Sequence, residues 1–162
     1  MLEYRMLTDF DMDKIVEYSN EYEFVDNKNL YVSERFNIEP FKKESSLRPI
    51  LFDGRIIMYA EVDLNTIKKA TCVSLPDLNT KSRVISILYM STDNHFIKKA
   101  ISFLETYFMD SAYSKIRLAY YEKEYNKSFA VELIDNGFKC EADLSSVLNN
   151  KKILCLKLDK EI

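Results

Sequence analysis

The segment from Arg117 to Leu158 constrains the fold of this chain more than any other part of the sequence. Its pattern predicts a strand, then a helix that Asn126 opens and Asn136-Gly137 ends, and then a hairpin with a polar turn. The arms of the hairpin are predicted over residues 138–144 and 153–158. This order predicts a helix packed on a sheet whose last strands run antiparallel.

An earlier part of the chain predicts a strand, a helix and a strand in direct succession. Residues 81–90 are β-rich and largely apolar, which is typical of a central strand buried on both faces. Ser91-Thr92-Asp93 then caps a helix, and the next strand spans residues 116–121. The apolar face of this helix consists of Phe96, Ile97, Ala100, Ile101, Leu104 and Phe108. Strands joined by such a crossover lie parallel, so we expect a mixed sheet.

The first part of the chain gives weaker signals. Residues 2–7 alternate well enough for a strand, and Thr8-Asp9 offers the N-cap of a helix that ends near Glu21. Residues 27–46 are polar and irregular, with a short helix predicted over Leu30–Phe36. We therefore expect mostly connecting chain in this segment.

A hairpin is predicted from Arg48 to Asp63, with its turn at Asp53-Gly54, because Asp-Gly between apolar runs supplies positive φ. Residues 66–80 predict a loop or a ragged strand that Pro76 breaks. The order as a whole predicts an α/β (α+β) fold with a central, mostly antiparallel mixed sheet of about seven strands flanked by helices. We expect a single domain over residues 1–162.

Composition and charge narrow the classes of partner. The net charge of -3 and the pI ≈ 5.3 argue against nucleic acid. No apolar run approaches the ~18 residues that cross a bilayer, so we expect no membrane segment. Cys72, Cys140 and Cys155 fit no metal spacing, and no signal peptide is evident. We therefore expect no metal site, and reduced thiols in the cytoplasm.

The order of strands and helices resembles the GNAT (N-acetyltransferase) superfamily over essentially the whole chain. Asp53 to Ala60 is similar to the second hairpin of that family, and Asn126 and Gly137-Phe138 match its Asn…Gly-Phe spacing. The resemblance implies an acyl-CoA N-acyltransferase that moves an acyl group from acetyl-CoA, or another acyl-CoA, to a primary amine by direct attack. The amine would belong to a small molecule or a peptide. Because the last hairpin often mediates pairing in relatives, a homodimer is a further expectation.

The resemblance also implies where the cofactor would bind. Residues 88–90 fall where the family strand separates from its neighbour and offers backbone groups to the pantetheine arm. The following residues stand where the family has a basic residue and a Gly-x-Gly segment around the pyrophosphate, at a helix N-terminus. The implied cofactor-binding residues are Leu88, Tyr89, Met90, Asn94, His95, Phe96, Ile97, Lys98, Lys99 and Asn126.

This loop departs from the family pattern in a specific way. Phe96 has a side chain where glycine lets phosphate approach the backbone, and Asp93 puts a negative charge beside an anion site. Asn94 tolerates the left-handed region, and His95 and Lys98-Lys99 supply compensating charge. An equally supported interpretation is that Asp93 only caps the helix and that the two lysines form a solvated face.

The residues that would perform the chemistry are less sharply marked. Glu61 is the candidate general base, because the alternation along its strand aims it across one sheet face, although it also fits the solvent end of a strand. The family often has a Tyr four residues before the Gly, where this chain has Leu133. Tyr121 and Tyr125 are the candidates to protonate the leaving thiolate, with Tyr120 as a third. Tyrosines in so aromatic a chain are, alternatively, core residues.

Two other functions stay open. Four departures from the family pattern favour a catalytically inactive GNAT-fold binding or regulatory module: Met58, Asp93, Phe96 and Leu133. An acyltransferase with an acyl carrier protein as donor is the other, because Lys98, Lys99 and Lys123 would meet an acidic carrier. An open groove beside residues 88–90 favours the enzyme, whereas side chains of Tyr89 and Phe96 filling it favour the module.

Overall fold

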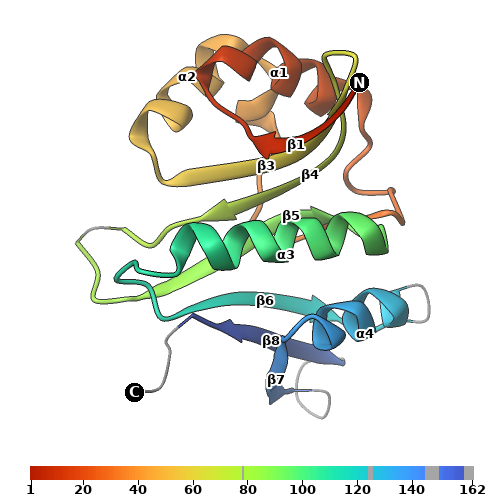
Figure 1. Ribbon diagram of the computed structural model, residues 1–162, viewed down its shortest axis with the longest axis vertical. Coiled ribbons are helices and arrows are strands. Elements are labelled where there is room, and N and C mark those ends of the chain that lie inside the picture. Colours follow the sequence, from red (N-terminus) through yellow and green to blue (C-terminus); the bar gives the residue numbers. More distant parts are fainter. Residues whose placement is uncertain (78, 124–125, 145–149, 159–162) are drawn as a thin grey trace.

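The computed structural model describes residues 1–77, 79–123, 126–144 and 150–158 (Figure 1). Their strands form one sheet in the order β1-β3-β4-β5-β6-β8-β7, and β2 pairs with β5 off this path. The strands are β1 (Leu2–Met6), β2 (Leu30–Val32), β3 (Ile56–Asp63), β4 (Thr66–Ser74), β5 (Val84–Ser91), β6 (Lys115–Tyr121), β7 (Lys139–Asp143) and β8 (Lys151–Lys157). The helices are η1 (Asp9–Asp11), α1 (Met12–Glu21), η2 (Glu39–Lys42), α2 (Glu44–Asp53), α3 (Asn94–Phe108) and α4 (Lys127–Asp135). The predicted mixed, mostly antiparallel sheet with flanking helices is confirmed.

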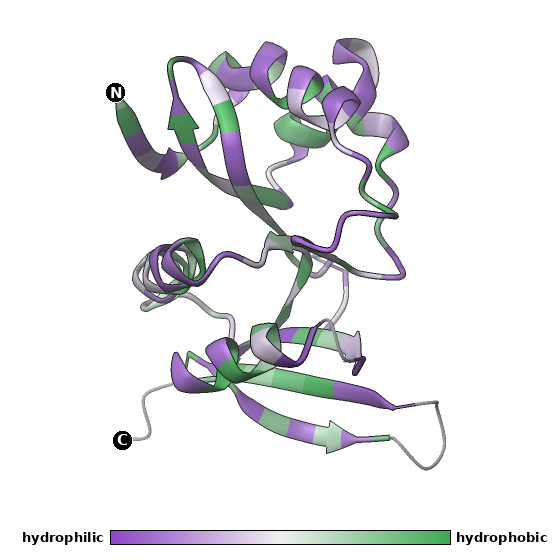
Figure 2. Cartoon of the chain, turned by 90° about the vertical axis from the view of Figure 1, so that its right-hand side faces the viewer, coloured by the Kyte–Doolittle hydropathy of each residue, from purple (hydrophilic) through white to green (hydrophobic). Residues whose placement is uncertain are grey.

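The sheet separates two apolar cores. On β3, Met58 and Ala60 face the core that α1 and α2 complete, whereas Tyr59 faces the core under α3 and α4. Figure 2 shows hydrophobic and hydrophilic segments in turn along the strands, in keeping with side chains that point alternately to opposite faces. Burial on both sides therefore fixes the register of the central strands.

The strand-helix-strand unit in the middle of the chain is confirmed. β5 and β6 pair in parallel, and α3 makes the crossover between them. Asp93 caps α3, and all six residues predicted for its apolar face are buried in the core. In the last part of the chain, Gly137 has φ +107 and ends α4, and β7 pairs with β8 as predicted. Of the predicted turn residues of this hairpin, Asn149 lies outside the described residues, and Asn150 has φ 68.

The predicted hairpin around Asp53-Gly54 is wrong. Residues 44–53 form α2, and Gly54, with φ 69, is its C-cap, donating its N–H to the Leu51 carbonyl at 3.3 Å. Positive φ after an apolar run ends a helix as readily as it turns a hairpin, so the local signal was ambiguous. The actual hairpin joins β3 and β4 through Leu64 and Asn65, whose φ values are 50 and 63.

One other local prediction is wrong, and another is settled between its alternatives. Leu30–Phe36 is not a short helix, since residues 30–32 form β2 and pair with the distant β5. Of the loop or ragged strand predicted over residues 66–80, the strand is correct: β4 spans Thr66–Ser74, pairs with both β3 and β5 with a register shift on each side, and ends before Pro76. In both cases, hydrogen bonding to a partner strand decides the conformation, and local propensity does not reveal that partner.

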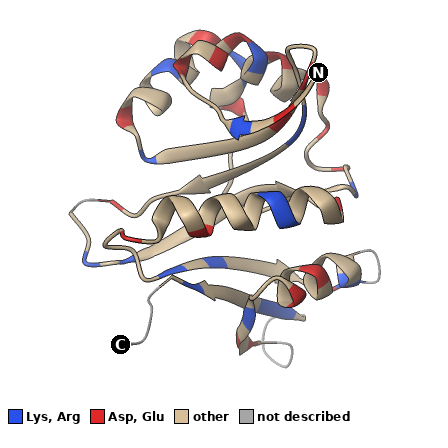
Figure 3. Ribbon diagram, viewed as in Figure 1, with Lys and Arg blue, Asp and Glu red and all other residues tan. Residues whose placement is uncertain are grey.

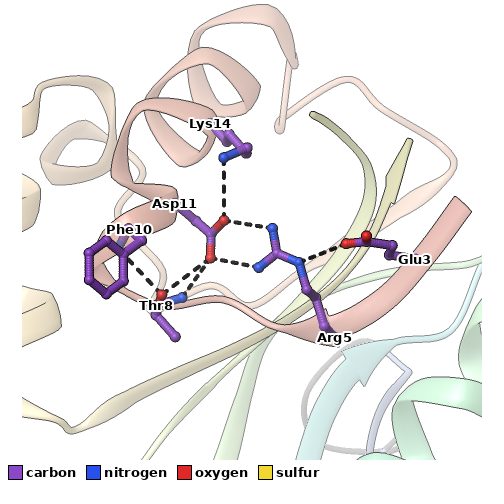
Figure 4. A network of polar contacts seen from close by, with 6 residues as sticks. All are labelled: Glu3, Arg5, Thr8, Phe10, Asp11 and Lys14. Atoms are coloured by element: carbon purple, nitrogen blue, oxygen red, sulfur yellow. Dashed lines mark hydrogen bonds and ion pairs between the residues drawn. The ribbon is translucent and has the colours of Figure 1, made fainter. Parts of the chain in front are cut away.

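A polar network fixes the junction between β1 and η1 (Figure 4). Arg5 donates two hydrogen bonds to the carboxylate of Asp11, at 2.8 and 2.7 Å, and Thr8 donates its N–H to it at 2.9 Å. Lys14 Nζ lies 3.5 Å from the same carboxylate. Burial alone would raise the pKa of Asp11, but these partners outweigh it and lower that pKa to about 2. The network therefore holds the first strand against the first helical turn.

Candidate active site

The site begins where β5 and β6 separate. The two strands pair only from Val84–Ser86 to Lys115–Arg117. Just beyond, the partners of β4 change from Val73↔Ile87 to Cys72↔Tyr89, so Leu88 is an extra residue and forms a β-bulge in β5. A bulge bends its strand and increases its twist, which directs the second half of β5 away from β6.

β2 lies in the resulting gap. It pairs antiparallel with β5, from Leu30 opposite Ser91 to Val32 opposite Tyr89. The pairing extends at both ends, because Ser33 N–H donates to the Leu88 carbonyl at 2.8 Å and Thr92 N–H donates to the Asn29 carbonyl at 2.9 Å. The edge of β5 on which residues 88–90 were expected to offer backbone groups is thus occupied by the chain itself. Backbone, rather than the side chains of Tyr89 and Phe96, fills it.

Tyr31 closes the remaining space between β2 and β6. Its hydroxyl donates a hydrogen bond to the carbonyl of Ala119 on β6. Its ring stacks on Phe129 of α4, with centroids 5.7 Å apart and planes at 23°. Burial raises the pKa of Tyr31, so this hydroxyl keeps its proton and acts as a donor.

A hollow lies on each side of this closure. One, of ≈ 140 Å³, contains Tyr31, Asn126 and Phe129 and lies on the α4 side. The other, of ≈ 230 Å³, contains Ser86 and Arg117, which alternate with the core-facing residues of β5 and β6 and so lie on the opposite face. Glu34 and Ala119 line both hollows. The hollows on the two faces of the sheet therefore meet at the gap between β5 and β6.

The start of α3 is not free to bind an anion in the expected way. Asp93 accepts the N–H of Phe96 at 3.0 Å and lies 3.2 Å from Lys69 Nζ. Partial burial raises the pKa of Asp93, but the Phe96 N–H and Lys69 outweigh it and hold that pKa below its ordinary value. Phe96 and Ile97 are fully buried, so their side chains belong to the core. The exposed members of the predicted set are Asn94, His95, Lys98 and Lys99.

Glu61 lies on the α3 face of β3, as its alternation with Tyr59 implies, and its exposed fraction is 7%. It accepts a hydrogen bond from the Tyr4 hydroxyl at 2.8 Å, and its other carboxylate oxygen is 3.8 Å from Lys69 Nζ. Burial, and then Glu61 itself, raise the pKa of Tyr4 to about 12. Glu61 is two strands away from β5, a separation of about 10 Å. It therefore lies near the start of α3 and not at the splay, the gap between β5 and β6 beyond Ser86 and Arg117.

The other predicted residues lie around the α4 end of the splay. Tyr121 lines the hollow on the α4 side, and Tyr120 is buried in the core. Tyr125 lies outside the described residues. Asn126 accepts the Lys123 N–H at 2.8 Å and donates to the Tyr121 carbonyl at 2.6 Å, so its amide holds the turn between β6 and α4. Leu133 is fully buried, which leaves its position without a polar group.

Among residues 1–77, 79–123, 126–144 and 150–158, no three His, Cys, Asp or Glu side chains are grouped closely enough to hold a metal ion. The helices of this part of the chain are too short or too polar to cross a membrane.

No protein-family model matches the sequence, and neither does any curated protein. The structure, in contrast, is similar to solved acetyltransferases. The match to a ribosomal-protein-S5-alanine acetyltransferase from Vibrio fischeri covers 98% of this chain and 94% of that chain, with a TM-score of 0.67 and 14% sequence identity. The match to a PaiA N-acetyltransferase from Thermoplasma acidophilum in complex with coenzyme A covers 97% of this chain and 99% of that chain, with a TM-score of 0.64 and 17% identity. The match to a spermidine N-acetyltransferase mutant from Vibrio cholerae covers 97% of this chain and 94% of that chain, with a TM-score of 0.63 and 16% identity. The chain therefore has the fold of the GNAT N-acetyltransferases.

Sequence reasoning missed that the segment from Asn29 to Arg35 lies at the splay, where its residues line both hollows. Leu30-Tyr31-Val32 is a run of β-forming residues and was the one local signal for a strand. Nothing nearby in the sequence indicates that its partner is β5. Tyr31, Glu34 and Arg35 are thus site residues that only the fold identifies.

Proposed function

We propose that this chain is an N-acyltransferase of the GNAT type, which moves an acetyl or other acyl group from an acyl-CoA to a primary amine. One observation carries the proposal: a hollow on each face of the sheet reaches the splay, and the two share Glu34 and Ala119. Acyl transfer needs a donor and an acceptor held in contact, and binding them from opposite faces avoids competition for one pocket. The similar solved structures are acetyltransferases, and one of them is a complex with coenzyme A.

The described residues, in the arrangement seen, do not fit an acyl-CoA held along β5. The backbone edge of residues 88–90 is paired with β2, and Asp93 already accepts the Phe96 N–H at the start of α3. The carboxylate of Asp93 also repels an anion there. We therefore infer that residues 29–33 must leave the edge of β5 before an acyl-CoA occupies it. The pairing between β2 and β5 spans three residue pairs, so such a displacement of a short strand is feasible.

The residues on the acceptor side suit an amine. Glu34 is the carboxylate that lines both hollows, and Lys151 Nζ is 3.4 Å from it. We assign to Glu34 the binding of the acceptor ammonium and the removal of its proton, because an amine must be neutral to attack an acyl group. Glu61, the candidate from the sequence, is separated from this point by two strands and suits the role less well.

Calorimetry with acetyl-CoA tests the proposal on a matched pair of variants. Ser33→Pro removes the N–H that donates to the Leu88 carbonyl, whereas Ser33→Ala keeps it. We expect Ser33→Pro to bind acetyl-CoA about five-fold more tightly than Ser33→Ala, since one lost hydrogen bond weakens the pairing of β2 by about 1 kcal/mol. Equal affinity of the two variants would show that β2 does not compete with the cofactor. Absence of binding to either would contradict the acyltransferase.

A GNAT-fold binding module without acyl transfer is the second candidate. The specific observation that favours it is the filled edge of β5, together with the capped start of α3. In this case neither Ser33 variant binds acetyl-CoA, and small amines or acids still raise the melting temperature of the wild-type protein. A ligand at 100 times its Kd adds about 2.7 kcal/mol to stability, which a thermal-shift assay detects.

A further inference from the structure

Two hollows adjoin on the face of the sheet opposite α3 and α4. The hollow of ≈ 230 Å³ at the splay shares Arg35 and Leu88 with a second hollow of ≈ 340 Å³ that extends toward η2 and α2. Figure 1 places α1 and α2 over the β1-β3-β4 end of the sheet, so these helices do not cover β6 and β8. The result is a continuous depression beside Glu34, large enough for a small molecule.

Basic residues dominate the hollow at the splay. Arg35, Arg117 and Lys151 line it, and Glu34 is the acidic residue in its lining. Figure 3 shows the same bias on a larger scale, with basic segments along β6 and β8. Arg117 is paired with Glu141 and Lys151 with Glu34, so Arg35 is the cation of this lining that has no ion pair among the described residues. An unpaired guanidinium group favours a ligand that carries a carboxylate.

The two arginines still have donors to offer. Arg117 donates one hydrogen bond to Glu141 at 2.9 Å, while its buried Nε has no hydrogen-bond partner among the described residues. The Arg35 side chain is exposed and forms no ion pair with any residue in the described part of the chain. Because the Nε of Arg117 is enclosed by protein, the donors that a ligand in the hollow would meet are the terminal nitrogens of the two guanidinium groups. Guanidinium groups bind carboxylates through paired N–H donors.

We propose that this hollow binds an amine that also carries a carboxylate, with Arg35 and Arg117 contacting the carboxylate and Glu34 contacting the ammonium group. Glu34, Arg35 and Arg117 line this one hollow, so a single small ligand can meet a carboxylate and a guanidinium group there. A free amino acid carries its two charged groups on one carbon and suits that arrangement. That this ligand is the acyl acceptor rests on the function proposed above, whereas its binding does not.

The proposal separates this chain from a polyamine acetyltransferase. One of the similar structures is a spermidine N-acetyltransferase. A polyamine in the hollow would place a second ammonium group among Arg35, Arg117 and Lys151, where like charges repel it. An amino acid instead places its carboxylate against the arginines and its single ammonium group against Glu34.

Calorimetry without any acyl-CoA tests the binding. The probes are L-alanine, L-phenylalanine and L-glutamate, each beside its α-carboxamide, and putrescine as an amine without a carboxylate. We expect at least one amino acid to bind ten-fold or more tightly than its amide, by about the strength of a hydrogen bond to a charged group. Arg35→Ala should lose about ten-fold in that affinity, and Arg48→Ala, a matched change of an exposed arginine on α2, should lose none.

The outcomes distinguish this proposal from the acyltransferase. Equal binding of acids and amides, no binding of any amino acid, or an unchanged affinity in Arg35→Ala would each overturn it. The same probes are then assayed for acetylation in the presence of acetyl-CoA. Acetylation of putrescine, with no amino acid bound or acetylated, would leave the acyltransferase standing and refute the carboxylate site. Binding of an amino acid, with no acetylation of any probe, would support the site and contradict the acyltransferase.

Discussion

The Arg5–Asp11 network and the splay of β5 and β6 differ in where their polar groups find hydrogen-bond partners. The network finds them nearby in the sequence, and the splay finds them in a distant segment. At Asp11, whose exposed fraction is 3%, each carboxylate oxygen has a partner, and all of these partners lie within six residues along the chain. At the splay, a distant three-residue strand, β2, pairs with the edge of β5, and the neighbouring Arg35 forms no ion pair among the described residues. The first region is held by contacts within its own local sequence. The second is closed by a distant segment, which we propose an acyl-CoA displaces.

The largest effect should come from breaking the closed network. Asp11→Ala removes the acceptor of two Arg5 hydrogen bonds and of the Thr8 N–H and leaves Arg5 with Glu3 alone, so the free energy of unfolding should fall by about 3 kcal/mol. Urea denaturation measures it. Asp13→Ala, at an exposed aspartate in the first turn of α1, is the control and should cost far less. A loss no larger than that of the control would mean that the network is not structural.

Acid should weaken the same region. The pKa of Asp11 is about 2 in the folded chain against an ordinary 3.8, so Asp11 binds a proton more readily when unfolded. A lowered folded pKa gives stability that is complete above pH 4 to 5 and lost as the pH falls toward 2, and here it amounts to about 2 kcal/mol. Urea midpoints across this range should fall more steeply for the wild type than for Asp11→Asn. Parallel curves would contradict the assignment.

The splay should respond less in stability and more in local opening. Tyr31→Phe removes the hydrogen bond to Ala119 but keeps the ring on Phe129, and should cost about 1 kcal/mol. Amide hydrogen exchange of β2 should become faster, because β2 is then held by fewer contacts. Tyr22→Phe, which removes a 3.0 Å hydrogen bond to the Lys68 carbonyl, is the matched control. Faster exchange in both variants alike would mean that β2 is not specially displaceable.

The smallest effect is expected at the start of α3. Asp93→Asn keeps a good N-cap for the Phe96 N–H and removes the negative charge, so stability should change little. If the pyrophosphate of an acyl-CoA binds there, affinity for acetyl-CoA should rise about two- to five-fold at low salt. The gain should shrink at higher ionic strength. Asp13→Asn is the control, and a lower affinity in Asp93→Asn would place the phosphates elsewhere.

The sequence predicted the elements whose signals are local and missed those that depend on distant partners. The apolar positions of α3 recur at helical spacing, so the sequence predicts all six of them. Gly54 was misassigned because positive φ serves both a hairpin turn and a helix end, and the packing of Leu47 in the core selects the helix. Among the site residues, Tyr121, Asn126 and Leu88 lie at the splay, whereas Glu61 lies near the start of α3. Their roles stay predictions.

The sequence by itself determined the parallel crossover through α3, the Asp93 cap and the glycine that ends α4. These features arise from hydrogen bonds and apolar spacing within a few residues, which a linear pattern contains. Only the tertiary structure decided that β2 occupies the edge of β5 and that Tyr31 bonds to Ala119, 88 residues away. A strand takes its partner from anywhere in the chain, because its backbone donors and acceptors point sideways to whichever edge the packing brings near.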